Sequence, residues 1–199
     1  MGEAAVRTRM TPEDYLAFER AAEQKHEFAN GEVFAMSGGT RAHALLSANF
    51  LGELRNALVD RPCEVYTSDL RVKIPAAPRY VYPDVSVACG DVRFEDDHGD
   101  TLLTPLVVVE VLSDSSEAYD RGDKFALYRS VPSVSDYVLV SQKAVQVEHY
   151  RRDADGSWRL VVLGRGDALA LASVGARVEV DRVYAKVTLV GATEATAAT

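Results

Sequence analysis

Three segments of the chain carry apolar residues at the spacing of an amphipathic helix. The first, over 12–24, begins after Thr11, which suits an N-cap because a proline and two acids follow it. The second covers about 40–60, and at about 100° per residue His43 falls on its inward face. The apolar stripe of that face includes Phe50, Leu51, Leu54 and Leu58. A third helix is expected after a run of serines, over about 117–130.

Strand-like patterns fill most of the remaining chain. Asn30-Gly31 lies between two β-prone stretches and predicts a two-residue hairpin turn. Segments 64–74 and 83–89 alternate between apolar and polar positions, whereas 105–112 is almost continuously apolar, as in a strand buried on both faces. Further strands are expected over SDYVLV, as a hairpin turning at Asp155-Gly156, and over ALAL and ARVEV near the C-terminus.

These elements predict one domain of the α/β class, more narrowly an α+β arrangement in which helices cover a mixed sheet. A chain of 199 residues is long enough for one sizeable core and too short for two comfortable domains. We expect the domain to cover 11–190. The N-terminal residues 1–10 are expected to be flexible and the Ala- and Thr-rich tail, 191–199, to be disordered.

The composition matches an ordinary globular protein, with 47% hydrophobic and 26% charged residues. No apolar run approaches the roughly 18 residues of a membrane helix, and the N-terminus lacks the apolar stretch of a signal peptide. A cytoplasmic protein that does not bind membranes is therefore expected. Two cysteines are too few for a disulfide scaffold or a four-ligand zinc site, and we expect Cys63 and Cys89 to be inert packing thiols.

The formal net charge is −8, because 22 Lys and Arg face 30 Asp and Glu. Such a charge predicts repulsion from a polyanion, or simply a solvated acidic surface. Half of the excess lies in the segment 91–100, which holds five acids and one Arg. Charge alone therefore neither supports nor excludes a nucleic-acid substrate.

Glu110 is the most conspicuous residue for chemistry, because it interrupts the apolar run 105–112. A carboxylate shielded from water costs several kcal/mol unless a cation, a proton or hydrogen-bond donors compensate it. Asp84 opens a second β-branched strand. Two such acids facing one another on neighbouring strands would suit a hard divalent cation. The structural alternative is that Glu110 pairs with an arginine and Asp84 caps a turn.

The helix that follows Glu110 carries a second signal. Asp120, Lys124 and Tyr128 are spaced i, i+4 and i+8, so they line one helix face. If this helix folds back on the Glu110 strand, the Lys124 ammonium reaches the same site. There it could orient an attacking water or neutralise a phosphate transition state. The alternative is an ordinary Asp–Lys surface pair beside a core tyrosine.

The ordered segments YPDVSV, LVVVEVLS and Asp120-x-x-x-Lys124-x-x-x-Tyr128 resemble the PD-(D/E)XK nuclease superfamily and, more narrowly, the Uma-type restriction endonucleases of bacteria. The likeness extends from Thr11 to about Val187. It implies a restriction-endonuclease-like core with flanking helices and an additional C-terminal β-hairpin. One element departs from the superfamily pattern: its Glu-x-Lys would place a lysine where this sequence has Leu112. Lys124, from the next helix, is the natural substitute.

The resemblance implies a metal-dependent phosphodiesterase with Asp84, Glu110 and Lys124 as catalytic residues. Asp84 and Glu110 would bind Mg²⁺ or Mn²⁺, together with the carbonyl of Val111. Residues implied to support this site are Glu27, His43, Asp69, Ser113 and Asp120. Their structural alternatives are a half-buried histidine for His43, exposed strand acids for Glu27 and Asp69, a helix cap for Ser113, and a partner that positions Lys124 for Asp120.

Two functions follow from this sequence. The first is a Mg²⁺- or Mn²⁺-dependent endonuclease acting on DNA as a homodimer, with one site for each strand. The second is a catalytically inactive nuclease-fold protein that acts as a binding or scaffold module, which the acidic net charge favours because tight DNA binding draws on many phosphate contacts. Retention of Asp84, Glu110 and a candidate lysine favours the enzyme.

Overall fold

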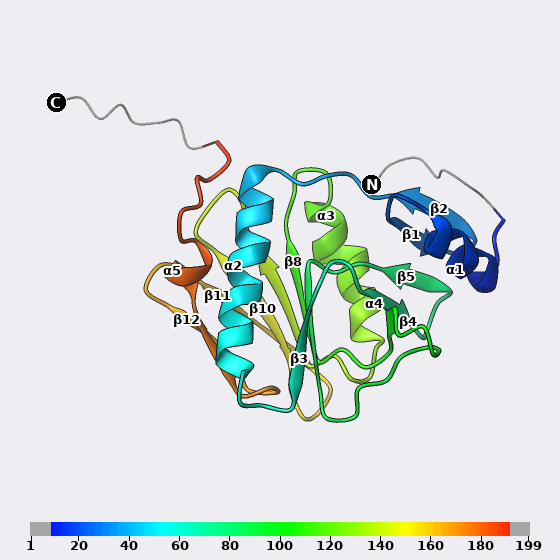
Figure 1. Cartoon of the computed structure of the whole chain (residues 1–199). Coiled ribbons are helices and arrows are strands. Elements are labelled where there is room, and N and C mark those ends of the chain that lie inside the picture. Colours follow the sequence, from blue (N-terminus) through cyan, green and yellow to red (C-terminus); the bar gives the residue numbers. More distant parts are fainter. Residues whose placement is uncertain (1–8, 192–199) are drawn as a thin grey trace.

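The computed structural model describes residues 9–191, which form two mixed sheets, a separate hairpin and the helices that cover them (Figure 1). The main sheet contains, in spatial order, β11 (Trp158–Leu163), β10 (Val147–Arg152), β9 (Asp136–Val140), β8 (Val107–Val111), β6 (Val85–Cys89) and β3 (Cys63–Thr67). The second sheet contains β2 (Glu32–Ala35), β1 (His26–Ala29), β5 (Arg79–Val81), β4 (Arg71–Ile74) and β7 (Thr101–Leu102). β8 runs antiparallel to β6 and parallel to β9, so the predicted mixed α+β class is confirmed.

The helices are α1 (Pro12–Ala21), α2 (Arg41–Leu58), α5 (Val180–Val183) and a composite helix made of α3 (Glu117–Tyr119), the π-helical turn η1 (Asp120–Lys124) and α4 (Phe125–Arg129). Figure 1 shows α2 on one side of β8 and α3 and α4 on the other, whereas α1, β1 and β2 gather at one end of the molecule. The main sheet is therefore covered by a different helix on each face.

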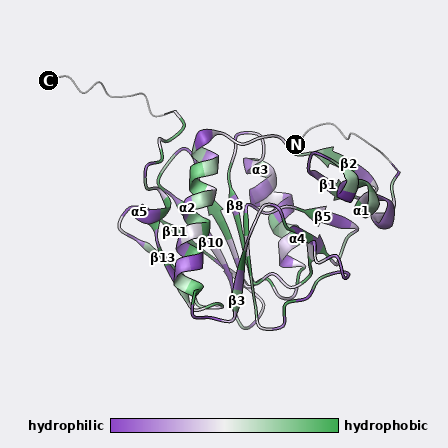
Figure 2. Ribbon diagram, viewed as in Figure 1, coloured by the Kyte–Doolittle hydropathy of each residue, from purple (hydrophilic) through white to green (hydrophobic). Residues whose placement is uncertain are grey.

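Strand β8 explains why the run 105–112 is apolar at nearly every position. Val107, Val109 and Val111 pack in the cluster that contains the buried stripe of α2, Leu46, Phe50, Leu54 and Leu58. Val108 points to the opposite face and packs in the cluster that contains Tyr128 of α4. Figure 2 shows β8 green, whereas the ribbon of α2 changes between green and purple. Glu110 shares the face of Val108, because side chains alternate along a strand.

The N-terminal helix and hairpin form largely as predicted. Thr11 caps α1 in a capping box, and Asn30 and Gly31 adopt φ of 52° and 91°, as the hairpin turn requires. The expected end near residue 24 is wrong, because α1 stops at Ala21. The chain turns away there so that Glu19 can accept the His26 N–H at 2.9 Å.

The segment 64–74, expected as one strand, is divided between the two sheets. A turn joins β3 of the main sheet to β4 of the second sheet. The turn closes through a bond from the Leu70 N–H to the Thr67 carbonyl, and the Thr67 hydroxyl accepts the Asp69 N–H. The chain also passes from β5 of the second sheet to β6 of the main sheet. Asp84 lies in this connection, at the junction of the two sheets.

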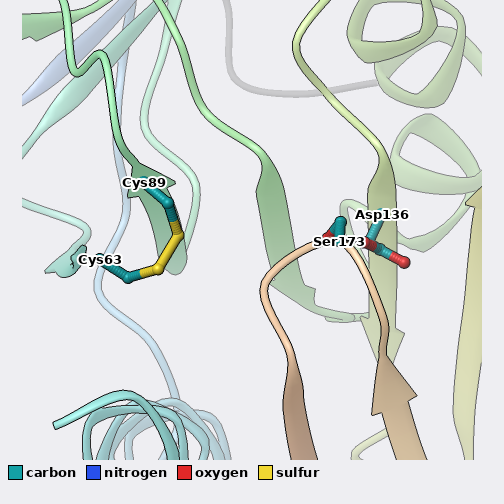
Figure 3. Close-up of a disulfide and its surroundings, with 4 residues drawn as sticks. All are labelled: Cys63, Cys89, Asp136 and Ser173. Atoms are coloured by element: carbon teal, nitrogen blue, oxygen red, sulfur yellow. Dashed lines mark hydrogen bonds between the residues drawn. A yellow bond between two sulfur atoms is a disulfide. The ribbon is translucent and has the colours of Figure 1, made fainter. Parts of the chain in front are cut away.

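The expectation of two free thiols is wrong, because Cys63 and Cys89 form a disulfide (Figure 3). The two cysteines lie directly opposite one another in the antiparallel register of β3 and β6. This register could not be read from the sequence, which places them 26 residues apart. The disulfide fastens the edge strand β3 to its neighbour.

The hairpin of β12 (Ala168–Leu171) and β13 (Ala176–Glu179) completes the domain at its C-terminal end. Ser173 in its turn donates a hydrogen bond to Asp136 of β9 (Figure 3). Asp136 also contacts His149 at 2.6 Å. At the other end of the chain, the Met10 N–H donates to the Gly31 carbonyl. Most of the predicted flexible start, 1–8, and of the predicted disordered tail, 192–199, lies outside the described residues. Between residues 9 and 191, no helix is long and apolar enough to cross a membrane.

Candidate active site

The register of β6 and β8 brings the two predicted metal-binding acids together. Val85 and Val109 form the last pair of this antiparallel ladder, and Asp84 and Glu110 are the residues directly beyond that pair. The Asp84 carboxylate is fixed by a 2.7 Å hydrogen bond from the Val111 N–H. Glu110 is only 4% exposed. The expectation that acids from neighbouring strands face one another is therefore met by the backbone geometry.

The composite helix folds back over β8 and delivers its lysine to Glu110. Lys124 Nζ lies 2.8 Å from Glu110 Oε1, and the Tyr128 hydroxyl donates to the same oxygen at 3.1 Å. Lys124 is 6% exposed and ends the π-helical turn that begins at Asp120. Such π-bulges within α-helices are found often at functional sites. The structural alternative, in which Glu110 pairs with an arginine, is wrong.

Two further carboxylates approach the same ammonium. Glu27 Oε1 and Asp120 Oδ1 each lie 3.7 Å from Lys124 Nζ. Glu27 comes from β1 of the second sheet, whereas Asp120 is 2% exposed within the helix. The cluster is therefore built from both sheets and from the helix that covers them, and sequence separation between its members reaches almost a hundred residues.

His43 supports the cluster from α2. Its Nε2 lies 3.3 Å from Asp84 Oδ2, and its backbone N–H is capped by the Thr40 hydroxyl at 3.1 Å. The hydrogen bond to Asp84 raises the pKa of His43 above its usual value, against the opposing effect of burial. The predicted inward direction of His43 is therefore correct, and its role is to contact Asp84.

The cluster holds more negative than positive charge. Three carboxylates, those of Glu27, Glu110 and Asp120, lie within 4 Å of the Lys124 ammonium, and the charge of a fourth, Asp84, acts on Glu110. Burial raises the pKa of Glu110 well above its usual value, Lys124 acts against this rise, and Asp120 and Asp84 add to it. Burial disfavours the Lys124 ammonium, but the carboxylates of Glu110 and Glu27 raise the pKa of Lys124 well above its usual value. Lys124 therefore stays charged, and its single positive charge does not balance the carboxylates of the cluster.

The oxygen donors of this cluster fit a hard divalent cation that keeps several of its waters. Within residues 9–191, no group of three or more His, Cys, Asp and Glu side chains is placed to hold a metal by itself. Asp84 and Glu110 supply two carboxylates directly beyond the last pair of the β6–β8 ladder. Mg²⁺ is commonly bound by one or two carboxylates and completed by waters and substrate phosphates. The excess negative charge fits such a cation as well.

Two of the predicted supporting residues lie elsewhere. Asp69 is exposed in the turn after β3, where it pairs with Lys25 at 2.6 Å. Ser113 lies in the turn before α3, where its hydroxyl accepts the Ser116 N–H at 3.2 Å, whereas the N-cap residue of α3 is Ser116. Val111 contributes its N–H to Asp84, and this contact differs from the predicted carbonyl ligand.

Three residues at the edge of the cluster were not singled out from the sequence. Arg79 of β5 donates to the Tyr119 hydroxyl of α3 at 2.9 Å, and the Tyr82 N–H donates to Glu27 at 3.4 Å. Arg79 stands two positions before Val81 on one face of its strand, but nothing in the sequence shows that β5 belongs to a second sheet. Only the three-dimensional packing of these elements shows that the residues meet, and no local sequence pattern could have found them.

Comparison with known proteins identifies close relatives in sequence. Residues 12–181 match the Uma2 family, whose description is "Putative restriction endonuclease". The Synechocystis "Uncharacterized protein slr1290" is 40% identical over 177 residues, covering 88% of this chain and 92% of that protein. "Uncharacterized protein sll1609" of the same organism is 34% identical over 154 residues, covering 77% of this chain and 87% of its own.

A solved structure shares the fold. It is the crystal structure of a "putative nuclease belonging to DUF820" from Anabaena variabilis, which superposes with a TM-score of 0.71. The alignment covers 88% of this chain and 98% of that chain, with 14% sequence identity. At this identity the likeness concerns the fold, and it agrees with the predicted nuclease-like core.

Proposed function

The chain belongs to the Uma2 family of restriction-endonuclease-like proteins, and from this premise we propose that it is a metal-dependent endonuclease that hydrolyses phosphodiester bonds of DNA. The observation that carries the proposal is the largely buried cluster in which Glu27, Glu110 and Asp120 lie 2.8–3.7 Å from Lys124 Nζ, while Asp84 adds a fourth carboxylate whose charge acts on Glu110. A scaffold protein has no need of such an arrangement, because an excess of buried negative charge lowers stability. A site that binds a cation explains it.

Asp84 and Glu110 would hold the Mg²⁺ or Mn²⁺ ion. When bound, such an ion polarises a phosphoryl oxygen and lowers the pKa of a bound water. His43 and the Val111 N–H orient the Asp84 carboxylate, and Tyr128 orients that of Glu110. Groups that fix ligands in this way contribute to metal affinity without touching the metal.

Lys124 is the group that would act on the reacting atoms. Its raised pKa keeps the ammonium charged at neutral pH, so it can donate hydrogen bonds to the attacking water or to a phosphate oxygen that gains negative charge. Glu27 and Asp120, each 3.7 Å from Nζ, hold the ammonium in place from opposite elements. Burial of the lysine also limits its motion, which favours a fixed orientation.

We also propose that two copies act together, one for each strand of a duplex, in the cytoplasm. Edge strand β11 supports the pairing, because Leu160, Val161 and Val162 are 48%, 42% and 55% exposed. An exposed apolar edge can pair with the same edge of a second copy about a twofold axis. Sedimentation velocity at micromolar concentration checks this: a dimer is expected for the wild-type protein and a monomer for Val161→Lys. A monomeric wild type would contradict the proposal.

The activity is tested by incubating supercoiled plasmid DNA with the protein in Mn²⁺, in Mg²⁺ and in EDTA. We expect nicked and linear products with either metal and none in EDTA. A preparation of Glu110→Gln, purified in the same way, controls for contaminating nucleases. If the wild-type protein yields no more product than this variant on duplex DNA, single-stranded DNA and RNA, the scaffold interpretation replaces the enzyme.

A further inference from the structure

Arg79 is a half-buried arginine beside the cluster with no acidic partner. Within residues 9–191, no Asp or Glu oxygen lies within 4.0 Å of its guanidinium. Among the described residues, the guanidinium makes one hydrogen bond, to the Tyr119 hydroxyl at 2.9 Å, and its buried Nε has no partner there. A buried donor without a partner costs about 1–3 kcal/mol, so such a group calls for an explanation.

Other basic side chains near this sheet are neutralised by acids. Arg71 lies 2.5 Å from Asp100, and Lys25 lies 2.6 Å from Asp69. Lys73 pairs with Glu95. Since acids are plentiful in this chain, the lack of one at Arg79 sets this residue apart.

Arg79 faces the candidate active site. β5 pairs with β1 so that Tyr80 lies opposite Phe28, and both pack in the cluster on the α1 side. Arg79 and Glu27 are neighbours of these two residues, so they occupy the other face of the sheet, where Glu27 meets Lys124.

Tyr119 connects Arg79 to the composite helix that carries Lys124, because Tyr119 directly precedes Asp120 in that helix. Burial raises the pKa of Tyr119, the charge of Glu27 adds to this rise, and the charges of Arg79 and Lys124 oppose it. One hydroxyl therefore lies within reach of the charges of all three residues. Tyr119 therefore holds the Arg79 guanidinium at the edge of the cluster of carboxylates around Lys124.

We propose that Arg79, oriented by Tyr119, binds a backbone phosphate of the nucleic acid and so positions the scissile bond beside Glu110 and Lys124. This inference rests on the proposed nuclease function. A guanidinium presents several N–H donors in a planar fork that matches phosphate oxygens, and Arg79 is only half-buried, so part of this fork is accessible to a phosphate. In a chain of net charge −8, a local cation beside the site offsets the repulsion that the substrate meets.

The test measures binding, separately from cleavage. A fluorescein-labelled 30-base-pair duplex is titrated with protein in Ca²⁺ at several KCl concentrations and followed by anisotropy. Arg79→Gln is expected to weaken binding about tenfold and to reduce the slope of log affinity against log salt by about one, as the loss of one phosphate contact predicts. Arg79→Lys keeps the charge, so it is expected to keep the slope and to lose part of the affinity.

The matched control is Arg55→Gln, which removes an exposed and unpaired arginine from α2 and is expected to change neither affinity nor slope. Tyr119→Phe is expected to fall between the wild type and Arg79→Gln, because the guanidinium stays but loses its fixed orientation. Thermal unfolding verifies that each variant is folded.

The outcomes separate this inference from the function on which it rests. If wild-type protein binds and cleaves the duplex but Arg79→Gln binds with the same affinity and slope, the inference is overturned and the nuclease stands. If wild-type protein neither binds nor cleaves any nucleic acid tested, the proposed function fails and this inference fails with it. In a cleaving wild type, a rise in KM with kcat retained for Arg79→Gln supports phosphate binding further.

Discussion

Two groups of charged side chains, on opposite faces of the second sheet, differ in how their charges balance. On the α1 face, Arg20 and Arg71 meet Asp96 and Asp100 at 2.5–2.8 Å, two cations against two anions. On the other face, Lys124 meets three carboxylates, and the charge of a fourth, Asp84, acts on Glu110. We call the first the balanced network and the second the acidic cluster. The charges of the balanced network cancel within the chain, whereas the excess negative charge of the acidic cluster calls for a cation from outside the chain.

The difference also appears in the pKa values. Arg20 and Arg71 hold the pKa of Asp100 well below its usual value, although partial burial opposes them. Burial raises the pKa of Glu110 well above its usual value. Ionised Asp100 therefore stabilises the fold, and ionised Glu110 destabilises it without a metal. Half of the excess negative charge of the chain lies in the segment of the balanced network, 91–100, where it fastens α1 to β4 and has no need of a partner molecule.

The largest expected effect comes from removing a charge that the acidic cluster uses. Glu110→Gln and Lys124→Met are each expected to lower the rate of plasmid cleavage by about 10²–10⁴-fold, the range of a positioned acid or base. Initial rates in saturating Mn²⁺ measure this loss, and circular dichroism shows whether the fold persists. A variant that keeps more than a tenth of the wild-type rate would remove that residue from the mechanism.

The two ends of β6 serve different purposes: the strand begins beside Asp84 of the candidate site and ends at Cys89 of the disulfide. Removing the disulfide is therefore expected to change stability and not metal binding. Closing a loop of 26 residues is expected to stabilise the fold by about 3.5 kcal/mol through the entropy of the unfolded chain. Cys63→Ala/Cys89→Ala should therefore unfold at lower urea concentration and still bind Mn²⁺. Loss of Mn²⁺ binding in a folded variant would show that the two ends of β6 are not independent.

Opposite stability effects are expected from neutralising one acid in each group. Asp100→Asn leaves Arg71, whose side chain is 5% exposed, without its carboxylate and should lower stability by about 1–3 kcal/mol with cleavage unchanged. Asp84→Asn keeps an acceptor for the Val111 N–H and removes one excess charge. In EDTA it should unfold at a higher temperature than wild type and yet fail to cleave. A lower unfolding temperature for both variants would remove the distinction.

The smallest effect is a difference in pH dependence. Asp100, with a lowered folded-state pKa, stabilises the fold above its unfolded pKa of about 3.9, and this contribution is lost as the pH falls towards its folded value. Glu110, with a raised folded-state pKa, has the opposite sign: in EDTA its contribution declines as the pH rises from about 4.3. Urea unfolding from pH 3 to 8 should show the first trend vanish in Asp100→Asn and the second in Glu110→Gln. The same profile in all three proteins would contradict both assignments.

Local patterns predicted most of the fold. The capping sequence at Thr11 and the turn at Asn30-Gly31 were correct because neighbouring residues determine them. The apolar run around Glu110 correctly predicted an interior strand. The division of 64–74 between two sheets was missed, because alternation along a strand does not show where its neighbours change.

The candidate site was predictable where one element presents its residues together. The helical spacing of Asp120 and Lys124 predicted their common face, and the strand pattern predicted that Glu110 is buried. Arg79 and the partner of Cys63 were missed because both depend on tertiary packing: Arg79 meets a helix that is distant in sequence, and Cys63 meets Cys89 through strand register. Residues that meet across sheets leave no local signal.

Titration calorimetry of Mn²⁺ into metal-free protein tests most directly whether the acidic cluster is a cation site. The account predicts saturable binding to wild type, undiminished binding to Asp100→Asn and Lys124→Met, and no binding to Glu110→Gln. The Lys124 variant matters because removing the one cation leaves more negative charge to attract the metal. An absence of binding to wild type, or equal binding to Glu110→Gln, would contradict the claim and make these carboxylates structural.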